Sequence, residues 1–216
     1  MSNMLEELWN SNTIYLTIVW GKLSQKVDED TPWAKKREYE TSDGNKGVKY
    51  EKHYKSVTGL IAGLEFKETD FGENLVVTLV NWADEVVLSL NTDGKYFTSF
   101  ARKLNNIDLN ETVTIGSFDF ESDGKRFTWV SIYNKWDKVE DYYYDGKKNL
   151  HGFPNINQDD LKEEWKDYWK WYFLEVKKFL KKEVKKVKVP EVKRATIDDA
   201  KDIFEDTDSD ISDLPF

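Results

Sequence analysis

The sequence predicts a mainly β protein that ends in a long helix and an acidic tail. Three observations indicate this class. Short apolar segments separated by turn residues follow one another from Val57 to Asn134, which is typical of strands. Apolar residues recur at helical spacing after Asn157. The residues beyond Pro190 are rich in acids and carry too few apolar side chains to fold alone.

Three strands open the predicted core. Residues 57–67 alternate between the two sides of a strand and form the first of them. Turns at 71–74 and 81–85 bound the next two strands, at 75–80 and 86–90. The side chains expected on one side of the first strand are Leu60, Ala62, Leu64 and Phe66.

One short helix and two further strands complete the core. After a break at 92–94, apolar residues recur at helical spacing until a pair of asparagines ends the helix. Strands at 112–120 and 126–134 follow, and residues 122–124 favour a hairpin turn between them. Three strands, a helix and two strands is the order of the OB-fold, a Greek-key barrel that binds oligonucleotides. We therefore predict a five-stranded OB-fold barrel within residues 1–156.

Two segments precede this core. Residues 13–20 predict an extra strand that pairs at a barrel edge. Residues 21–56 form a polar stretch that is too long for a simple connection. Loops of that length in compact domains are usually functional or disordered. We expect this insertion to be such a loop.

A longer helix is predicted over residues 157–189. Asn157 is suited to cap its start, and Pro190 marks its latest end. Its first half is aromatic and its second half is rich in lysine. We expect the aromatic half to dock on the barrel or on a second copy of the chain, which would make a homo-oligomer. The lysines either form a solvated face, contact DNA or hold the acidic tail. Glu175 and Glu183 interrupt the cationic face that a membrane-surface helix would need.

Composition excludes several classes of protein. The 216 residues suffice for one domain with appendages, and the absence of cysteine excludes disulfides and thiolate metal sites. The amino terminus shows no signal-peptide pattern, and no apolar stretch approaches the length of a membrane span. We therefore expect a soluble, cytoplasmic protein. Most of the formal net charge of −9 lies in residues 195–216, so a basic groove elsewhere is not excluded.

Catalytic signatures are absent from the sequence. Its two histidines are His53 and His151, and no acids with the spacing of zinc ligands accompany them. No phosphate-binding glycine loop, dinucleotide fingerprint or nucleophile elbow occurs. A nuclease that uses carboxylate-bound Mg²⁺ is a minor alternative, because acid pairs such as Asp159-Asp160 fit the start of a helix. We predict a binding protein rather than an enzyme, with no cofactor and no metal.

The acidic tail ends in a short apolar tip. Pro215 holds the tip extended, and the ring and carboxylate of Phe216 suit a shallow apolar pocket beside a basic residue. This ending resembles the carboxy-terminal tip of bacterial and bacteriophage single-stranded-DNA-binding proteins, which finish in an acidic run followed by Asp, an aliphatic residue, Pro and Phe. The residues that match this pattern are Asp213, Leu214, Pro215 and Phe216.

The resemblance implies two roles for the tail. Its tip would dock replication, recombination or repair proteins, and the disordered run over residues 190–216 would compete with DNA for the protein's own groove. The partner-binding residues predicted in this way are Asp210, Asp213, Leu214, Pro215 and Phe216.

The insertion combines the two features that single-strand binding needs, which are cations for phosphates and exposed rings for base stacking. The stacking candidates within it are Trp33, Tyr39, Tyr50 and Tyr54. The phosphate candidates are Lys35, Lys36, Arg37, Lys46, Lys49, Lys52 and Lys55. Either these residues contact DNA, or the rings only cover the barrel.

The last strand supplies a second group of aromatic candidates. Its small aliphatic side chains, among them Val130 and Ile132, suit a barrel interior. The rings that would then face outward are Phe127, Trp129 and Tyr133. They form either a stacking platform or the seat of the long helix. Trp82, at a junction of strand and turn, is a further stacking candidate.

Together these features predict sequence-nonspecific binding of single-stranded DNA in bacteriophage DNA replication, recombination or repair. Two alternatives remain open. In the first, the chain is an OB-fold module that binds protein or RNA. In the second, it is a phage structural or assembly protein with no single-stranded-DNA function.

Overall fold

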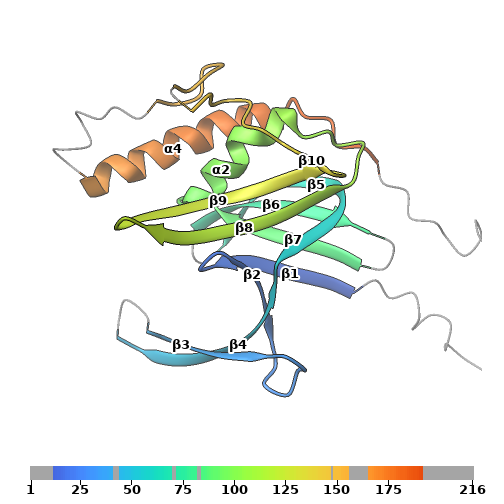
Figure 1. The fold of residues 1–216 in the computed structure, drawn as a ribbon, viewed down its shortest axis with the longest axis vertical. Coiled ribbons are helices and arrows are strands. Elements are labelled where there is room, and N and C mark those ends of the chain that lie inside the picture. The colour runs from blue at the N-terminus through green and yellow to red at the C-terminus, as the bar shows by residue number, and fades with distance from the viewer. Residues whose placement is uncertain are drawn as a thin grey trace, which may run out of the picture.

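The computed structural model describes residues 12–40, 44–69, 72–81, 84–146, 148–155 and 165–191. They form one mixed sheet of ten strands with two helices packed at one end of it (Figure 1). The strands are β1 (Asn12–Val19), β2 (Lys22–Val27), β3 (Lys35–Glu40), β4 (Lys46–Tyr54), β5 (Ser56–Thr69), β6 (Gly72–Val80), β7 (Asp84–Asn91), β8 (Val113–Ser122), β9 (Lys125–Asn134) and β10 (Asp137–Lys138). The helices are α2 (Lys95–Lys103), which a short 3-10 turn at Leu104–Asn106 extends, and α4 (Trp165–Val184).

The predicted class and order of elements are confirmed. The structure is mainly β, and β5, β6, β7, α2, β8 and β9 follow one another as three strands, a helix and two strands. The structure does not confirm the five-stranded barrel, because the sheet is open and runs in the order β10-β9-β8-β5-β6-β7-β1-β2-β4-β3. β7 pairs in parallel with β1 and not with β9. The sheet then continues from β1 through β2, β4 and β3.

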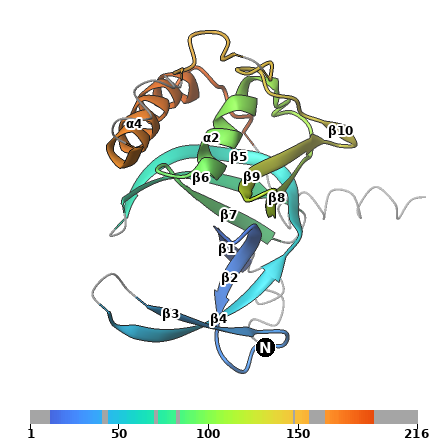
Figure 2. The same ribbon diagram turned by 60° about the vertical axis from the view of Figure 1, so that its left-hand side comes forward.

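The insertion at 21–56 is not a loop, and this part of the prediction is wrong. It folds into β2, β4 and β3, which extend away from the rest of the sheet (Figure 2). These strands carry polar side chains on both faces, so they lack the alternation of apolar and polar residues that identifies a half-buried strand. We call β3 and β4, with the part of β2 that pairs with β4, the arm.

A bulge in β5 changes which of its side chains enter the core. The register shifts between Ile61 and Gly63, and such a shift turns the following side chains to the other face. Before the bulge the fully buried side chain is Ile61, and after it the side chains that face the core are Leu64 and Phe66. The four residues predicted to share one side of the strand, Leu60, Ala62, Leu64 and Phe66, therefore do not all share it. Leu64 and Phe66 are partly buried and pack against the core.

The long helix docks on the rest of the chain, as expected for its aromatic half. α4 packs against α2 and β5, and it buries Tyr172, Val176 and Leu180. Lys177 and Lys181 lie 3.4 and 2.5 Å from the carboxylate oxygens of Glu73 in β6, so two of the predicted lysines anchor the helix to the sheet. The predicted start of the helix, before Trp165, lies outside the described residues.

No helix within the described ranges combines the length and the apolar character needed to cross a membrane.

At the free edge of β9, a side chain of α2 forms hydrogen bonds with backbone groups that no described strand pairs. The Ser99 hydroxyl accepts a hydrogen bond from the Val130 amide at 3.0 Å and donates one to its carbonyl at 3.4 Å. This arrangement protects an edge that would otherwise be open to pairing with another chain.

The turn between β1 and β2, from which the arm begins, packs against β8. Trp20 and Gly21 both have positive φ, at 47° and 74°, which is typical of a two-residue type I′ hairpin turn. A Cβ on Gly21 would lie 2.6 Å from the backbone nitrogen and the Cβ of Asp119 in β8. Only glycine allows this close approach of two backbones.

We expect Gly21→Ala to destabilise the fold by about 3 kcal/mol, because it adds a steric clash to the cost of a left-handed alanine. Gly124→Ala is the matched control, since Gly124 occupies the same position in the turn between β8 and β9, has φ of 68° and has no atom near its Cβ position. It should cost only about 1 kcal/mol. Urea unfolding of both variants measures the difference, and equal losses would contradict the contact between the turn and β8.

Candidate nucleic-acid interface

The hairpin of β8 and β9 carries a cluster of exposed aromatic rings. Its register pairs Phe118 with Trp129 and Phe120 with Phe127, and directly paired side chains share one face of a sheet. Both pairs are stacked, each with centroids 5.3 Å apart, and Phe120 also meets Trp129 edge to face. We call these four residues the platform. The three phenylalanines are each more than two fifths exposed, and a contiguous exposed apolar patch is typical of a binding surface.

The outward direction of Phe127, Trp129 and Tyr133 is as predicted. Val130 and Ile132 on the opposite face of β9 are fully buried, while the three rings are exposed or half-buried. α4 is not seated on the platform and packs instead against α2 and β5. Tyr133 lies nearer the other end of β9, where it pairs with Thr114 and Lys138, and it does not join the platform.

Phe118 and Phe120 are platform residues that the sequence analysis missed, although a signal for them exists. A two-residue turn at Asp123 and Gly124 fixes the register of the hairpin. Counting outward from that turn places Phe120 opposite Phe127 and Phe118 opposite Trp129.

The arm has two faces, and the predicted residues are divided between them. Directly paired residues and alternate residues along a strand share a face, so the register of β3 with β4 assigns each side chain. The first face, which we call the odd face, holds Lys35, Arg37, Tyr39, Lys49, Glu51 and His53. The second, the even face, holds Lys36, Lys46, Tyr50, Lys52 and Tyr54. The candidates of the insertion therefore do not form one continuous surface.

A buried acid organises the odd face. Glu51 accepts hydrogen bonds from Arg37, with Nε 2.9 Å from both carboxylate oxygens and Nη2 2.5 Å from Oε1. These bonds hold the pKa of the Glu51 carboxyl below its ordinary value, despite the opposing effect of burial. His53 Nε2 lies 3.5 Å from the same carboxylate. Arg37 is thereby fixed in position rather than left to move in solvent.

The remaining side chains of the odd face are available for contact. Lys49 lies over the Tyr39 ring at 4.6 Å from its centroid, and the same ring covers Gly47 on the neighbouring strand. Lys35 is exposed at the start of β3. A cation beside an accessible ring can bind a phosphate while the ring stacks on a base.

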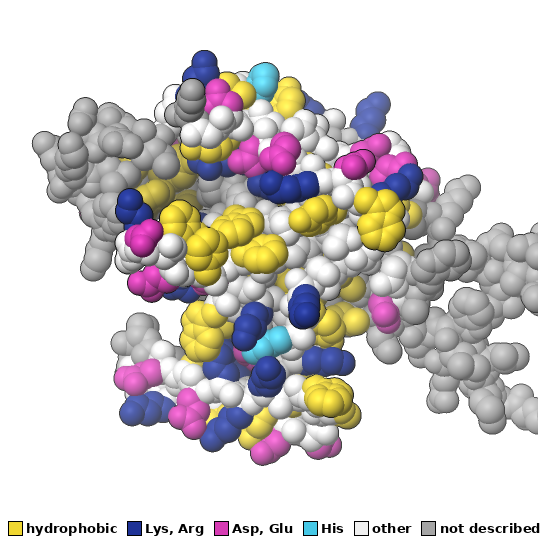
Figure 3. Space-filling view, viewed as in Figure 1, with side chains coloured by type: hydrophobic (Ala, Val, Ile, Leu, Met, Phe, Trp, Pro, Cys, Tyr) yellow, Lys and Arg dark blue, Asp and Glu magenta, His cyan; other side chains and the backbone are white. Residues whose placement is uncertain are grey.

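Trp20 adds an exposed ring to the basic surface of the odd face. The Arg37 guanidinium lies 5.4 Å from the centroid of the Trp20 ring, and Trp20 is 65% exposed. Its neighbour Gly21 contacts Asp119 of β8, whose side chain lies on the face of that strand opposite to Phe118 and Phe120. Figure 3 shows both surfaces on one side of the molecule. Basic side chains gather around a histidine on the arm, and hydrophobic rings lie above them over β8 and β9.

Asp119 itself is occupied by partners inside the hairpin. It accepts hydrogen bonds from Arg126 at 2.8 and 2.5 Å, and the Tyr96 hydroxyl lies 3.4 Å from it. The hydrogen bonds from Arg126 hold the pKa of the Asp119 carboxyl below its ordinary value. Because Arg126 pairs with this carboxylate, the negative charge of Asp119 repels an approaching phosphate only weakly.

The even face offers a weaker positive charge. Lys36 pairs with Glu38 at 3.0 Å and Lys46 with Glu40 at 4.0 Å. The Tyr54 hydroxyl donates to Gln25 at 2.6 Å, and Lys52 lies over the Tyr54 ring. The neighbouring acids Glu38 and Glu40 make this face less suited to a polyanion than the odd face.

The other predicted residues are dispersed or lie outside the described ranges. Trp33 is 85% exposed in the turn between β2 and β3, and Lys55 is exposed between β4 and β5. Trp82 lies outside the described residues. The same holds for the tip residues Asp210, Asp213, Leu214, Pro215 and Phe216.

Comparisons with protein-family models, with curated proteins and with solved structures each find no match to this chain. The function is therefore inferred from the chemistry of the surface.

Proposed function

We propose that this protein binds single-stranded DNA without sequence preference, through the platform, Trp20 and the odd face of the arm. The observation that carries the proposal is the presence, on one side of the molecule, of exposed rings next to a basic surface. Each base that stacks on an aromatic ring contributes roughly 1–3 kcal/mol, and every base has such a face. Lysine and arginine follow the phosphates.

The stacked geometry of the platform favours a single strand over a duplex. A ring can stack on a base only where the base has no neighbour on that face, and paired bases in a duplex are already stacked. Phe118, Phe120 and Phe127 are exposed on a hairpin that projects from the core, so an unpaired base can reach them. No enzymatic step is part of the proposal.

We further propose that β5 to β9 with α2 form a unit related to the OB-fold. The order of its elements supports this relation. So does β5, whose first part pairs with β8 while the rest pairs with β6, as a long strand shared by two parts of a Greek-key sheet would. The carboxy-terminal tip supports the same class through its resemblance to phage and bacterial single-stranded-DNA-binding proteins.

Titration of a fluorescently labelled strand of about 30 nucleotides, with a duplex of equal length as the comparison, tests the proposed function. Fluorescence anisotropy should show the duplex binding at least about ten-fold more weakly, because its bases cannot stack on the platform. Equal affinity for the single strand and the duplex would show that charge attraction alone, without base stacking, accounts for the binding. No binding of the single strand would contradict the function itself.

The acidic tail belongs to the same proposal as a competitor for the odd face and as the segment that recruits a replication or recombination protein through Phe216. Residues 195–216 hold eight acids and one lysine, so their removal should tighten binding of a single strand several-fold at low salt. Phe216→Ala should leave that affinity unchanged while partner binding is lost. An unchanged affinity after deletion would show that the tail does not compete.

A further inference from the structure

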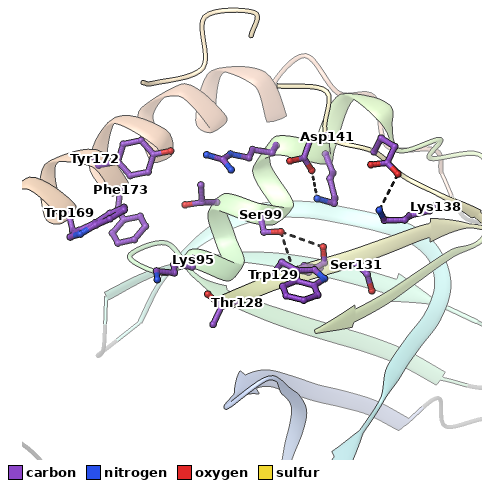
Figure 4. A pocket seen from close by; sticks show the side chains of 15 residues that line it. Lys95, Ser99, Thr128, Trp129, Ser131, Lys138, Asp141, Trp169, Tyr172 and Phe173 are labelled. Carbon is purple, nitrogen blue, oxygen red and sulfur yellow. Dashed lines mark hydrogen bonds and ion pairs between the residues drawn. The ribbon is translucent and has the colours of Figure 1, made fainter. Parts of the chain in front are cut away.

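A cleft of about 460 Å³ lies between α2, the edge of β9 and α4 (Figure 4). This volume falls within the range of small-ligand sites. Trp169 and Phe173 of α4 stand on one side of the cleft and Trp129 of β9 on the other. Trp129 also belongs to the platform, so the cleft begins where the platform ends.

Aromatic side chains form two walls of the cleft. Trp169 and Phe173 are stacked, with centroids 5.7 Å apart and planes 30° from parallel. Both are only partly buried, so each still presents surface to a ligand. Trp129 has the Phe118 ring against its other side. A flat, apolar group between these walls would meet rings on both of its faces.

The charges of the cleft leave two cations without an acidic partner. Both acids that line it are matched with lysines, Asp141 with Lys103 and Glu140 with Lys138. Neither Lys95 nor Arg102 forms an ion pair with any residue in the described part of the chain. The two sit on α2, and Lys95 is exposed while Arg102 is half-buried.

Arg102 is the more informative of the two cations. Its guanidinium lies 4.3 Å from the centroid of the Tyr144 ring and 5.9 Å from that of Phe153. These ring contacts orient the group, and the Tyr172 hydroxyl, which lines the same cleft, is a further neighbour of the guanidinium. The Arg102 Nε is enclosed and has no partner within the described residues. The enclosed Nε is out of reach of a ligand, but the side chain is only half-buried and its terminal nitrogens form no ion pair within the described residues. These nitrogens are therefore suited to a phosphate or carboxylate that enters from outside.

We propose that the cleft takes one nucleotide of a bound single strand, with its base between Trp129 and the pair formed by Trp169 and Phe173, and the two phosphates that flank it on Lys95 and on Arg102. The inference rests on the proposed function, because the strand reaches the cleft from the platform through Trp129. It adds a second stacking site, on the helical side of β9, to the one on the hairpin.

Affinity of full-length variants for a labelled dT strand of about 30 nucleotides tests this site. Trp169→Leu removes the stacking surface and Lys95→Glu reverses an unpaired charge, and each should weaken binding roughly five-fold or more. Trp171→Leu is the matched control on α4, since Trp171 is exposed and does not line the cleft. Lys148→Glu is the matched control for charge, as an exposed lysine outside the cleft. Both controls should stay within about two-fold of the parent protein.

Two outcomes separate this inference from the proposed function. If Trp169→Leu and Lys95→Glu both bind like the parent while Phe120→Ala loses affinity, the cleft is not a nucleotide site and the platform still is. If the parent protein binds no single strand, the proposed function fails and the cleft inference fails with it. Thermal unfolding identifies any loss of fold in Trp169→Leu, in which case Lys95→Glu decides the result.

Discussion

Replacing Phe120 with leucine is expected to lower the affinity for single-stranded DNA about ten-fold, because one stacking contact of about 1.4 kcal/mol is lost. Phe120 is the ring that contacts both of its neighbours in the platform, Phe127 by stacking and Trp129 edge to face. It is also nearly half exposed, so the substitution leaves the core untouched. Fluorescence anisotropy with a labelled dT strand measures the change.

Phe120→Tyr is the control that separates stacking from general hydrophobicity. Tyrosine keeps the π-face, so its affinity should match that of the parent, whereas leucine is apolar but cannot stack. Equal affinity for the leucine and tyrosine variants would show that the ring is not used for stacking. Trp171→Leu provides a second control, as an exposed ring on α4 away from the platform.

The second large effect is expected in the salt dependence of binding. A double variant, Lys35→Gln with Lys49→Gln, removes two cations of the odd face. The slope of log affinity against log salt should become shallower by about 1.4, at roughly 0.7 for each single-strand phosphate contact. At 0.1 M salt this corresponds to roughly a 25-fold loss of affinity. Titrations at four or five salt concentrations give the slope.

The arm supplies its own matched control for this experiment. Lys36→Gln with Lys46→Gln removes the same charge from the even face of the same two strands. Both of these lysines already face a glutamate, Glu38 and Glu40. The control should change the slope far less than the odd-face variant. A larger change in the control would place the DNA on the opposite face of the arm.

Local patterns predicted the elements between Val57 and Asn134. The strands there have one apolar face, and short turns separate them, so the order of elements could be obtained from sequence spacing alone. The same logic failed at β5, because the bulge after Ile61 interrupts the period of two. A bulge of this kind leaves no signal in the alternation before it.

The arm could not be predicted from periodicity. Its strands are polar on both faces, and β3 reads as a run of charged residues. What stabilises them is cross-strand pairing, such as Arg37 with Glu51 and Tyr39 over Gly47. These pairs appear only once β4 is known to run between β2 and β3.

The candidate interface was predicted in part. The outward rings of β9 followed from the burial of its aliphatic face, and the basic residues of the arm were recognised by type. Trp20 was missed because its role depends on contacts between distant segments. It lies beside Arg37, 17 positions further along the chain, and next to a glycine that touches β8. The cleft was missed for the same reason, since its walls come from β9, α2 and α4.

Tryptophan emission of the full-length protein, followed while a dT strand of about 30 nucleotides is added at low and then at moderate salt, tests the central claim most directly. Trp20 and Trp129 lie within the proposed interface, so we expect strong quenching at low salt that weakens as salt is added. An emission that does not change at either salt concentration, in the intact protein and again after removal of residues 195–216, would contradict single-strand binding through these rings.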